Sequence, residues 1–313
     1  MRYNHYTSKS PKISEIGFGA WQLGNPIAWS SMTDHDAINL VHEALDMGEN
    51  FFDTAPNYGK GASERLLGEA LKNINRSKIA INTKFGHTHA GETNYSADYI
   101  RESLEGSLKR LKTDYVDSIL IHSPEKKYID GSHNEHYEVL EQLKKEGKIL
   151  AYGASLENSA EMISYMTHTE GQVIEAFFNI LHQDARHAFE MAREKGVVVI
   201  AKIPLDSGWL SGKYTADSTF DGVRSRWSQA DITTRARVVD QIKDIPIEGQ
   251  SLSQVAIAYC LSYEAVATVI PGNKNLEQLD LNVRSADYPM SEKTVSRLEQ
   301  FYDHQIKGMH LPW

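Results

Sequence analysis

The fold is decided by the segment Phe51-Phe52-Asp53-Thr54-Ala55-Pro56-Asn57-Tyr58-Gly59-Lys60-Gly61-Ala62-Ser63-Glu64. A short apolar run ends at Asp53, and Tyr58 follows in a loop rich in Pro, Asn and Gly. We expect Ser63 to act as the N-cap of a helix over 64–71. The order strand, loop, helix places Asp53 where a strand stops and Tyr58 in the loop above it. Taken alone, the segment also fits a hydrogen-bonding Asp and a half-buried Tyr with no chemical role.

The same order of strand, loop and helix recurs along the chain. Short apolar or β-branched runs alternate with stretches whose apolar residues recur at helical spacing. The predicted strands are 16–23, 50–53, 79–84, 116–121, 149–154, 173–178, 197–203 and 267–270. The predicted helices are 34–47, 63–71, 97–111, 134–146, 160–167, 183–194, 233–242, 251–262, 276–286 and 291–304.

Alternation of strands with helices predicts an α/β fold with a parallel sheet that is buried on both faces. Eight such units in 313 residues favour a closed (β/α)8 TIM barrel over an open doubly wound sheet. An open dinucleotide-binding sheet would also need G-x-G-x-x-G after its first strand, and Gly17-Phe18-Gly19-Ala20-Trp21-Gln22 lacks the third glycine. We expect residues 1–313 to form a single domain, with a C-terminal helix and tail over about 291–313.

Composition limits the class of protein. A hydrophobic fraction of 41% is enough for a large core, and the net charge of -9 argues against nucleic-acid or anionic-membrane partners. The single cysteine, Cys260, excludes an internal disulfide and a cysteine-based metal cluster. No run approaches the roughly 18–20 apolar residues of a membrane span, and the N-terminus lacks the apolar core of a signal peptide. A cytoplasmic protein is therefore the expectation.

A barrel carries its active site at the carboxyl ends of its strands, so polar residues at those ends are candidates. Asp53 ends the second predicted strand and Tyr58 follows it, while Lys84 ends the third strand and His122 the fourth. Consecutive strands lie about 5 Å apart, so the four side chains can meet. A lone Lys there is usually solvated and a lone His usually caps or packs, but their coincidence on three neighbouring strands favours a catalytic site.

The segments around these residues resemble the aldo-keto reductase superfamily, which comprises NAD(P)H-dependent carbonyl reductases on a (β/α)8 barrel. The resemblance runs from Gly17 to Asn282, which is nearly the whole chain. Its segments are GFGAWQLG, NFFDTAPNYGKGASERLLGEAL, NTKFG, RLKTDYVDSILIHSP, KKEGKILAYGAS, IPLDSGWLSGKY and VIPGNKNLEQLDLN.

The resemblance implies a role for each of the four candidates. Tyr58 would be the general acid that protonates a carbonyl oxygen as hydride arrives from the cofactor. Its free pKa of about 10 is too high for this near neutrality, and the Lys84 ammonium is expected to lower it. Asp53 would pair with Lys84, and His122 would orient the carbonyl and stabilise charge on its oxygen. No metal is expected.

The resemblance also implies cofactor contacts in the last half of the chain. It places the nicotinamide amide near Ser155 and Glu175 and stacks its ring on Phe178. Two positions differ from the common family pattern, because Leu156 stands where Asn often follows the Ser and Glu175 stands where Gln is usual.

A glycine-rich loop resembles the family's cover over the pyrophosphate, and a later segment resembles its adenosine end. A cation at Lys274 beside a helix N-terminus suits a 2′-phosphate, so NADPH is favoured, with NADH as the alternative. The remaining candidates for cofactor binding are Pro204, Leu205, Ser207, Leu210, Gly212, Lys213, Gly272, Lys274, Gln278 and Asn282.

The substrate is expected to be a small carbonyl compound, with Trp21 and Trp29 as candidate walls of its pocket. Its identity depends on the loops 22–33, 86–96, 123–133 and 214–232. Two alternatives stay open: an NAD-dependent sugar or polyol dehydrogenase, and a cofactor-sensing regulatory subunit with the same barrel. The lack of an extra N-terminal segment weighs against the second. A homo-oligomer is possible, and the sequence does not fix the assembly state.

Overall fold

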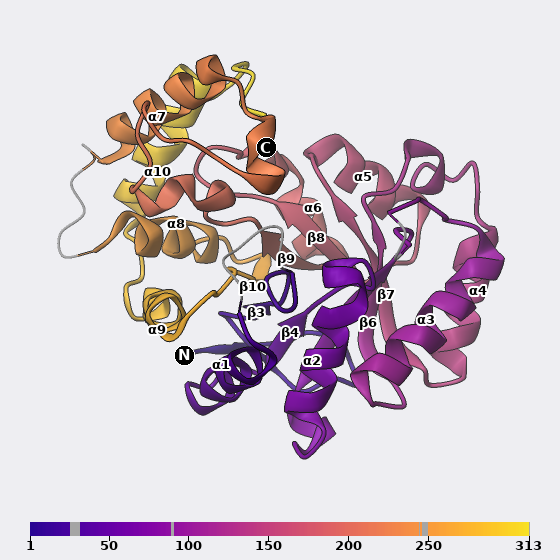
Figure 1. The fold of residues 1–313 in the computed structure, drawn as a ribbon. Coiled ribbons are helices and arrows are strands. Elements are labelled where there is room, and N and C mark those ends of the chain that lie inside the picture. Colours follow the sequence, from indigo (N-terminus) through magenta and orange to yellow (C-terminus); the bar gives the residue numbers. More distant parts are fainter. Residues whose placement is uncertain (26–31, 89–90, 244, 246–249, 313) are drawn as a thin grey trace.

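The computed structural model describes residues 1–25, 32–88, 91–243, 245 and 250–312. Eight parallel strands follow one another in chain order around a single sheet, with helices on its outer side (Figure 1). The strands are β3 (Phe18–Gly19), β4 (Phe51–Asp53), β5 (Ala80–Phe85), β6 (Val116–His122), β7 (Ile149–Leu156), β8 (Val173–Phe177), β9 (Val198–Lys202) and β10 (Val266–Val269).

The sheet closes on itself between its first and last strands. The Gly17 N–H donates to the Val269 carbonyl at 2.9 Å, and the Val269 N–H donates to the Glu15 carbonyl at 3.0 Å. Parallel bridges join Ile16 to Val269 and Gly19 to Gly272. The predicted (β/α)8 barrel is therefore confirmed, although only two residues of the predicted first strand, 16–23, pair regularly with β4.

Helices surround the barrel and turn their apolar faces toward it. In the third helix, Ile100, Leu104 and Leu108 recur at a spacing of four and are buried. The helices are α1 (Asp34–Asp46), α2 (Ala62–Leu71), α3 (Ala97–Leu111), α4 (Glu135–Lys145), α5 (Ser159–His168), α6 (Phe189–Lys195), α7 (Gln229–Lys243), α8 (Leu252–Leu261), α9 (Leu276–Arg284) and α10 (Glu292–Phe301).

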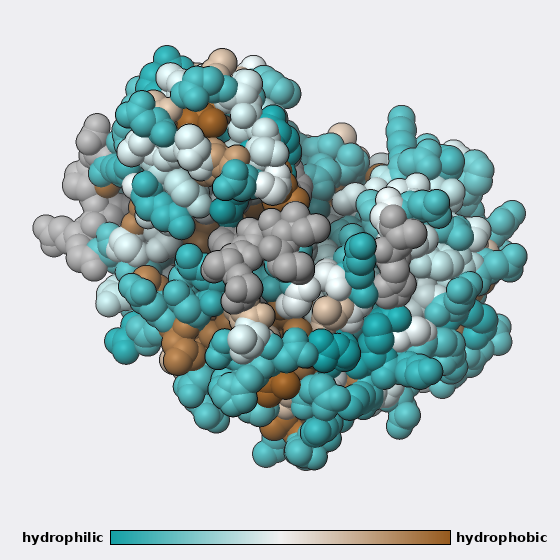
Figure 2. Space-filling view, in the orientation of Figure 1, coloured by the Kyte–Doolittle hydropathy of each residue, from teal (hydrophilic) through white to brown (hydrophobic). Residues whose placement is uncertain are grey.

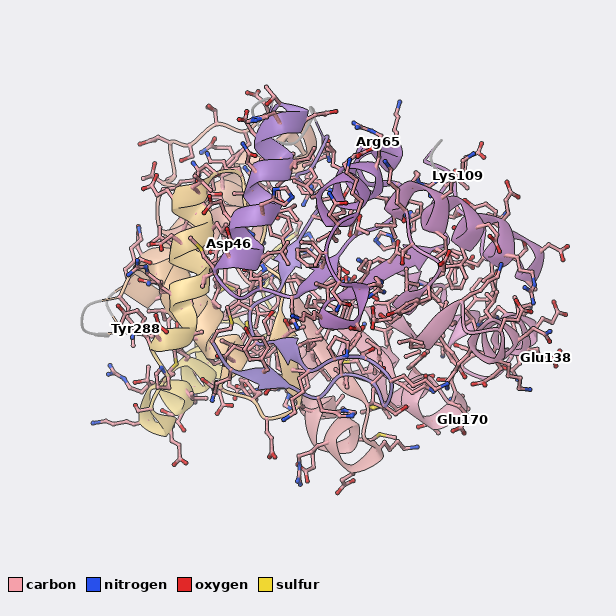
Figure 3. All side chains as sticks on the ribbon, turned by 90° about the horizontal axis from the view of Figure 1, so that it is seen from below. Asp46, Arg65, Lys109, Glu138, Glu170 and Tyr288 are labelled. Atoms are coloured by element: carbon pink, nitrogen blue, oxygen red, sulfur yellow. The ribbon has the colours of Figure 1, made fainter. Side chains whose placement is uncertain are left out.

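The outer faces of these helices are charged. Seen from below, Arg65, Lys109 and Glu138 point away from the barrel (Figure 3). The face drawn in Figure 2 is mostly hydrophilic, and its hydrophobic colour is confined to small separate patches. None of the helices in the described ranges is long and apolar enough to cross a membrane.

The expectation that Ser63 caps α2 was wrong. The helix begins at Ala62, and its N-cap is Gly61, whose φ of 85° suits a glycine. Ser63 lies inside the first turn and is buried. Its hydroxyl donates to the Ala20 carbonyl at 2.7 Å and bonds the Thr54 hydroxyl at 2.8 Å. Ser63 therefore ties the helix to the ends of β3 and β4.

An N-terminal hairpin closes the barrel at the end where its strands begin, and the sequence did not predict it. Strands β1 (Tyr3–Asn4) and β2 (Ile13–Ser14) pair antiparallel. From the loop between them, Tyr6 reaches into the barrel and meets Phe51 edge to face, with ring centroids 5.2 Å apart. The apolar cluster around it comprises Tyr6, Ile13, Phe51, Ala80, Leu120, Ala151, Val173, Ile200, Ala267 and Ile270.

A line of hydrogen bonds runs up the barrel from this hairpin. Tyr6 bonds the Ser118 hydroxyl, which in turn donates to the Asn82 side-chain carbonyl. The Asn82 amide then donates to Asp53 Oδ2 at 2.6 Å. Strand register brings these groups side by side, because Asn82 pairs with Asp53 on one side and with Ser118 on the other. The line links the closed end of the barrel to Asp53 at its open end.

The C-terminal part of the chain lies beside α7 and α8 (Figure 1). The Tyr263 hydroxyl of the loop after α8 donates to Glu299 of α10 at 2.7 Å. Further on, the Pro312 carbonyl accepts from Trp227 Nε1 at 2.8 Å and from Arg235 Nη1 at 2.7 Å. These bonds fix residues 311–312 beside α7.

Candidate active site

A cavity of about 710 Å³ opens where the strands end. It extends from the mouth of the barrel to the N-terminus of α9, so it collects residues from both halves of the chain. The predicted site residues that line it are Trp21, Asp53, Tyr58, His122, Glu175, Pro204, Leu205, Ser207, Lys213, Gly272, Lys274, Gln278 and Asn282.

Lys84 lies directly beneath the cavity floor and is fully buried. Its Nζ donates to Asp53 Oδ1 at 2.8 Å and to Asp53 Oδ2 at 2.7 Å. The same nitrogen lies 5.2 Å from the centre of the Tyr58 ring. The rings of Tyr58 and His122 meet edge to face, with centroids 5.8 Å apart. The structure therefore brings together all four residues predicted to be catalytic.

A tight turn after Tyr58 holds its ring in this position. Gly59 and Lys60 both adopt left-handed backbone angles, with φ of 55° and 54°. A side chain at Gly59 would place its Cβ 2.5 Å from the Gly24 carbonyl oxygen, so only glycine allows this close approach. The turn sends the chain into α2 and leaves Tyr58 beside the end of β4.

Burial raises the pKa of Tyr58 above its usual value of 10.0. Lys84 acts in the opposite direction, but Asp53 and Glu175 add to the rise. Lys84 therefore acts on this pKa in the expected direction, but burial outweighs it and the net change is a rise.

His122 is a neutral imidazole in this site. Burial lowers its pKa well below 6.5, and the nearby charges of Lys84 and His87 lower it further. The backbone holds it in place, because its carbonyl accepts from the Tyr95 hydroxyl at 2.8 Å. Its Nδ1 is buried without a hydrogen-bond partner among the residues that the structure describes.

Glu175 approaches Lys84 from the opposite side of the barrel. Its Oε2 lies 3.0 Å from Lys84 Nζ, and its Oε1 accepts from the Ser155 hydroxyl at 3.1 Å. Burial, followed by the charge of Glu175, raises the pKa of Asp53 to about 7, while Lys84 opposes both effects. Lys84 and then Lys202 hold the pKa of Glu175 below its usual value despite its burial.

Lys202 is a cavity residue that the sequence reasoning missed. Its Nζ donates to the Ser155 hydroxyl at 2.9 Å and to Glu157 Oε1 at 2.7 Å. Ser155 itself is fully buried behind these groups. A signal for Lys202 was present, because it ends β9 two residues after the inward-facing Ile200, and side chains alternate along a strand.

The structure does not bring Phe178 to the cavity. Its ring packs outward against Phe189, Tyr259 and Tyr263, with centroids 4.9, 5.6 and 5.1 Å away. Strand alternation explains this, because Glu175 faces into the barrel and a residue three positions later faces the other way. Two further candidates, Leu210 and Gly212, also lie outside the cavity wall, and Trp29 lies outside the described residues.

One wall of the cavity is cationic. The turn η5 (Asp206–Ser211) contains left-handed Ser207 and Gly208, and Lys213 follows it. Arg224 and Arg226 of η6 (Gly222–Arg226) line the same wall, and Arg224 Nη1 donates to the Tyr214 hydroxyl at 3.1 Å. The loop 214–232 was expected to help determine the substrate. The structure places part of it beside the loop predicted to cover the pyrophosphate.

The far end of the cavity is built on the start of α9. Asn275 caps the helix by accepting from the Gln278 N–H at 2.9 Å, and the Lys274 N–H donates to the Gln278 side chain at 3.2 Å. Asn282 donates to the Asn273 side chain at 2.7 Å and so holds the preceding loop. Lys274, Gln278 and Asn282 all line this end of the cavity.

Several polar atoms of the cavity residues have no hydrogen-bond partner among the described residues. They are Gln22 Oε1, Asn57 Oδ1, His122 Nδ1 and Glu175 Oε2. Buried polar atoms without a hydrogen bond are costly, so the atoms among these that face the cavity suit a polar ligand. Outside residues 26–31, 89–90, 244, 246–249 and 313, no group of three or more His, Cys, Asp or Glu is arranged to hold a metal.

Comparison with known proteins agrees with this geometry. The sequence model described as "Aldo/keto reductase family" matches residues 15–303. The NADH-specific methylglyoxal reductase of Escherichia coli (strain K12) is 28% identical, with coverage of 92% of this chain and 96% of that protein. The L-galactose dehydrogenase of Arabidopsis thaliana is 28% identical, with coverage of 96% and 94%.

A probable voltage-gated potassium channel subunit beta of Oryza sativa subsp. japonica is also 28% identical, with coverage of 92% of each chain. Among solved structures, the holo form of aldo-keto reductase AKR11C1 from Bacillus halodurans superimposes with a TM-score of 0.83. It shares 26% identity, and the match covers 100% of both chains.

Proposed function

Because the chain belongs to the aldo/keto reductase family, a family of NAD(P)H oxidoreductases, we propose that it reduces an aldehyde or ketone with NADPH. Tyr58 is the general acid of this proposal. The observation that carries it is the meeting of Tyr58 and His122 at the cavity floor, directly above the Lys84–Asp53 pair. A carbonyl oxygen that contacts both rings would take a proton from Tyr58 and be held in position by His122.

The cavity residues suit a dinucleotide. The cationic wall of Lys213, Arg224 and Arg226 fits a pyrophosphate, and the unpaired atoms at the barrel mouth fit the polar edge of a nicotinamide. A side chain at Gly272 would place its Cβ 1.6 Å from Gln22 Nε2, so glycine there makes room for the Gln22 side chain in the cavity wall. When bound, the nicotinamide supplies the hydride.

The residues of the chain supply the proton and the electrostatic field. The Tyr58 hydroxyl donates its proton to the substrate oxygen, and Lys84 stabilises the phenolate that is left. Asp53 fixes the ammonium with two hydrogen bonds and offsets the free energy of its burial. His122 is neutral, so it polarises the carbonyl by hydrogen bonding and not by a full charge.

Our preference for NADPH rests on Lys274 and the N-terminus of α9 at the far end of the cavity. Two relatives favour a second candidate, an NAD-dependent sugar or polyol dehydrogenase. One is named as NADH-specific and the other as an L-galactose dehydrogenase. The channel-subunit relative likewise keeps the cofactor-sensing regulatory role open.

Titration of the purified protein with NADPH and then NADH, followed by tryptophan fluorescence, separates these candidates, because Trp21 lines the cavity. We expect tighter binding of NADPH, followed by its oxidation in the presence of small aldehydes or ketones. Tighter NADH binding with oxidation of sugars or polyols would replace the proposal by the second candidate. Tight binding without turnover on either panel would support the regulatory role.

A further inference from the structure

The Lys84 ammonium lies between two carboxylates. It donates to both oxygens of Asp53, and Glu175 Oε2 lies 3.0 Å away on the other side. The backbone carbonyl of Thr54 accepts from the same nitrogen at 3.2 Å. An ammonium has three N–H donors, so these groups satisfy it without Tyr58.

Glu175 is firmly held and yet incompletely paired. Ser155 donates to its Oε1, and Lys202 donates to the Ser155 hydroxyl, so its position is fixed from behind. The approach of Lys84 to Oε2 is an ion pair without the angle of a hydrogen bond, and that oxygen is otherwise unpartnered in the described chain. The exposed fraction of the Glu175 side chain is 3%, which leaves little screening by water.

The charges around Lys84 do not balance when both acids are ionised. Asp53 and Glu175 carry two negative charges against one positive charge. Of the further neighbours, Tyr58 and Tyr6 are phenols and His122 is a neutral imidazole. The charge of Lys202 also acts on Glu175, but Glu157 balances it in an ion pair of 2.7 Å. Two buried carboxylates around one cation favour retention of a single proton by the pair.

We propose that Glu175 is a positioning residue that couples the acid strength of Tyr58 to the ionisation of the Asp53–Glu175 pair. This proposal rests on the proposed function. With one proton on the pair, the net charge beneath Tyr58 is zero and Lys84 favours the phenolate. Without that proton, the net charge is -1 and proton donation from Tyr58 is opposed.

The chemical step balances in both states. Hydride adds to the carbonyl carbon, the C=O π electrons move to oxygen, and that oxygen takes the Tyr58 proton. Solvent then returns a proton to the phenolate. The charge of the carboxyl pair changes only the free energy of the transient phenolate, so it changes the rate and not the products.

The test compares the wild type with Glu175→Gln, which keeps the side-chain shape and restores the residue that is usual in the family. Glu49→Gln is the matched control, because Glu49 is an equally buried carboxyl outside the cavity. Carbon-13 NMR of labelled Asp and Glu in the protein without cofactor gives the first readout. The signal that Glu49→Gln removes belongs to Glu49. Of the other signals, we expect one carboxyl of the Asp53–Glu175 pair to titrate near neutral pH in the wild type and in Glu49→Gln, and none in Glu175→Gln.

The pH dependence of kcat/KM for carbonyl reduction gives the second readout. We expect the wild-type value to fall on the order of tenfold between pH 6 and pH 9 as the pair loses its proton, and the Glu175→Gln value to stay flat. If Glu175 had only a structural role, Glu175→Gln would lower kcat/KM by the same factor at low and at high pH. A neutral-range titration of Asp53 that persists in Glu175→Gln, or that is missing from the wild type, would overturn the proposal.

The two readouts also separate this inference from the proposed function. If no carbonyl is reduced, the proposed function fails, while the NMR titration still decides whether the two carboxyls share a proton. If reduction occurs with the same pH dependence in both proteins, the inference fails and the proposed function stands.

Discussion

The rings of Tyr58 and His122 meet edge to face at 82°, with their centroids 5.8 Å apart. The two residues come from different units of the barrel, since Tyr58 follows β4 and His122 ends β6. Each keeps part of its surface open to the cavity even though both lie deep in the molecule. A substrate oxygen can therefore reach both only from the cavity side, and this arrangement determines the first two predictions.

Replacement of Tyr58 by Phe removes the phenolic proton and keeps the ring. We expect carbonyl reduction to fall by about 10²–10⁴-fold, the usual contribution of a general acid, with dinucleotide affinity largely retained. Steady-state kinetics and fluorescence titration measure the two quantities. Tyr288→Phe, at an exposed residue far from the site, is the control and should match the wild type. Retained turnover in Tyr58→Phe would remove Tyr58 from its proposed role.

His122 should stay uncharged throughout the neutral range. Because its folded pKa lies well below 6.5, we expect no change in its protonation between pH 8 and pH 6. Nitrogen-15 NMR of labelled histidines, assigned by comparison with His122→Asn, measures this directly. A His122 signal that titrates near 6.5 would contradict the neutral imidazole and would mean that a full charge can act on the carbonyl oxygen.

Lys274 should discriminate between the two dinucleotides. Removal of its charge in Lys274→Ala should weaken NADPH binding by about tenfold, equivalent to about 1.4 kcal/mol, and barely affect NADH. Titration of both cofactors measures the ratio, and Lys274→Arg should retain the preference. An equal loss for both cofactors would show that Lys274 does not read a 2′-phosphate.

Glu49 is a buried carboxyl whose two oxygens lack a hydrogen-bond partner among the described residues. Burial raises its pKa well above 4.5, so the folded protein binds a proton that the unfolded chain releases. Its stabilising effect is therefore complete below pH 4.5 and is lost as the pH rises through the folded pKa. We expect Glu49→Met to raise the free energy of unfolding by about 1–3 kcal/mol at pH 8.

Urea unfolding of both proteins at pH 5 and pH 8 tests this prediction. The advantage of Glu49→Met should be larger at pH 8, since the neutral acid at pH 5 is less costly to bury. An advantage that is equal at the two pH values would show that Glu49 does not titrate between them.

A buried ion pair joins η5 to α7, which in turn holds the C-terminal residues. Arg235 Nε lies 2.8 Å from Asp206 Oδ2, and both side chains are almost completely buried. Arg235 also donates to the Leu311 and Pro312 carbonyls. We expect Arg235→Met to cost about 3–5 kcal/mol of unfolding free energy, because it leaves the Asp206 carboxylate unpaired.

The double variant Asp206→Asn with Arg235→Met separates the ion pair from the packing. It should recover part of that loss, because the uncompensated charge is removed as well. Chemical denaturation of the four proteins in this cycle gives the coupling energy. Strict additivity of the two changes would mean that the pair makes no net contribution.

Local pattern predicted most of the barrel. Short apolar runs and the helical period of 3.6 identified the eight strand–helix units, and the rule that barrel sites lie at strand ends found Asp53, Lys84 and His122. The same rule, applied consistently, would have found Lys202 and would have rejected Phe178, because strand alternation turns Phe178 outward. These two errors came from relying on resemblance where strand geometry was available.

Other features depend on contacts that local pattern does not contain. The pairing of Glu175 with Lys84 joins β8 to β5, which are not neighbours in the sheet, so it follows only from closure of the barrel. The N-terminal hairpin has strands of two residues, too short for a periodic signal. Serine is a common N-cap residue, but the left-handed Gly61 caps α2, which therefore begins one residue before Ser63.

The hydrogen-bonded line from Tyr6 to Asp53 has a consequence for engineering the protein. In barrels of this type the two ends are usually treated as separable, one for chemistry and one for stability. Here hydrogen bonds through Ser118 and Asn82 join the closed end to the open end. Changes to the N-terminal hairpin, such as peptide fusions or grafted loops, would therefore also alter the hydrogen bonds that reach Asp53. Variants of the hairpin that are selected for heat resistance should be screened for altered turnover.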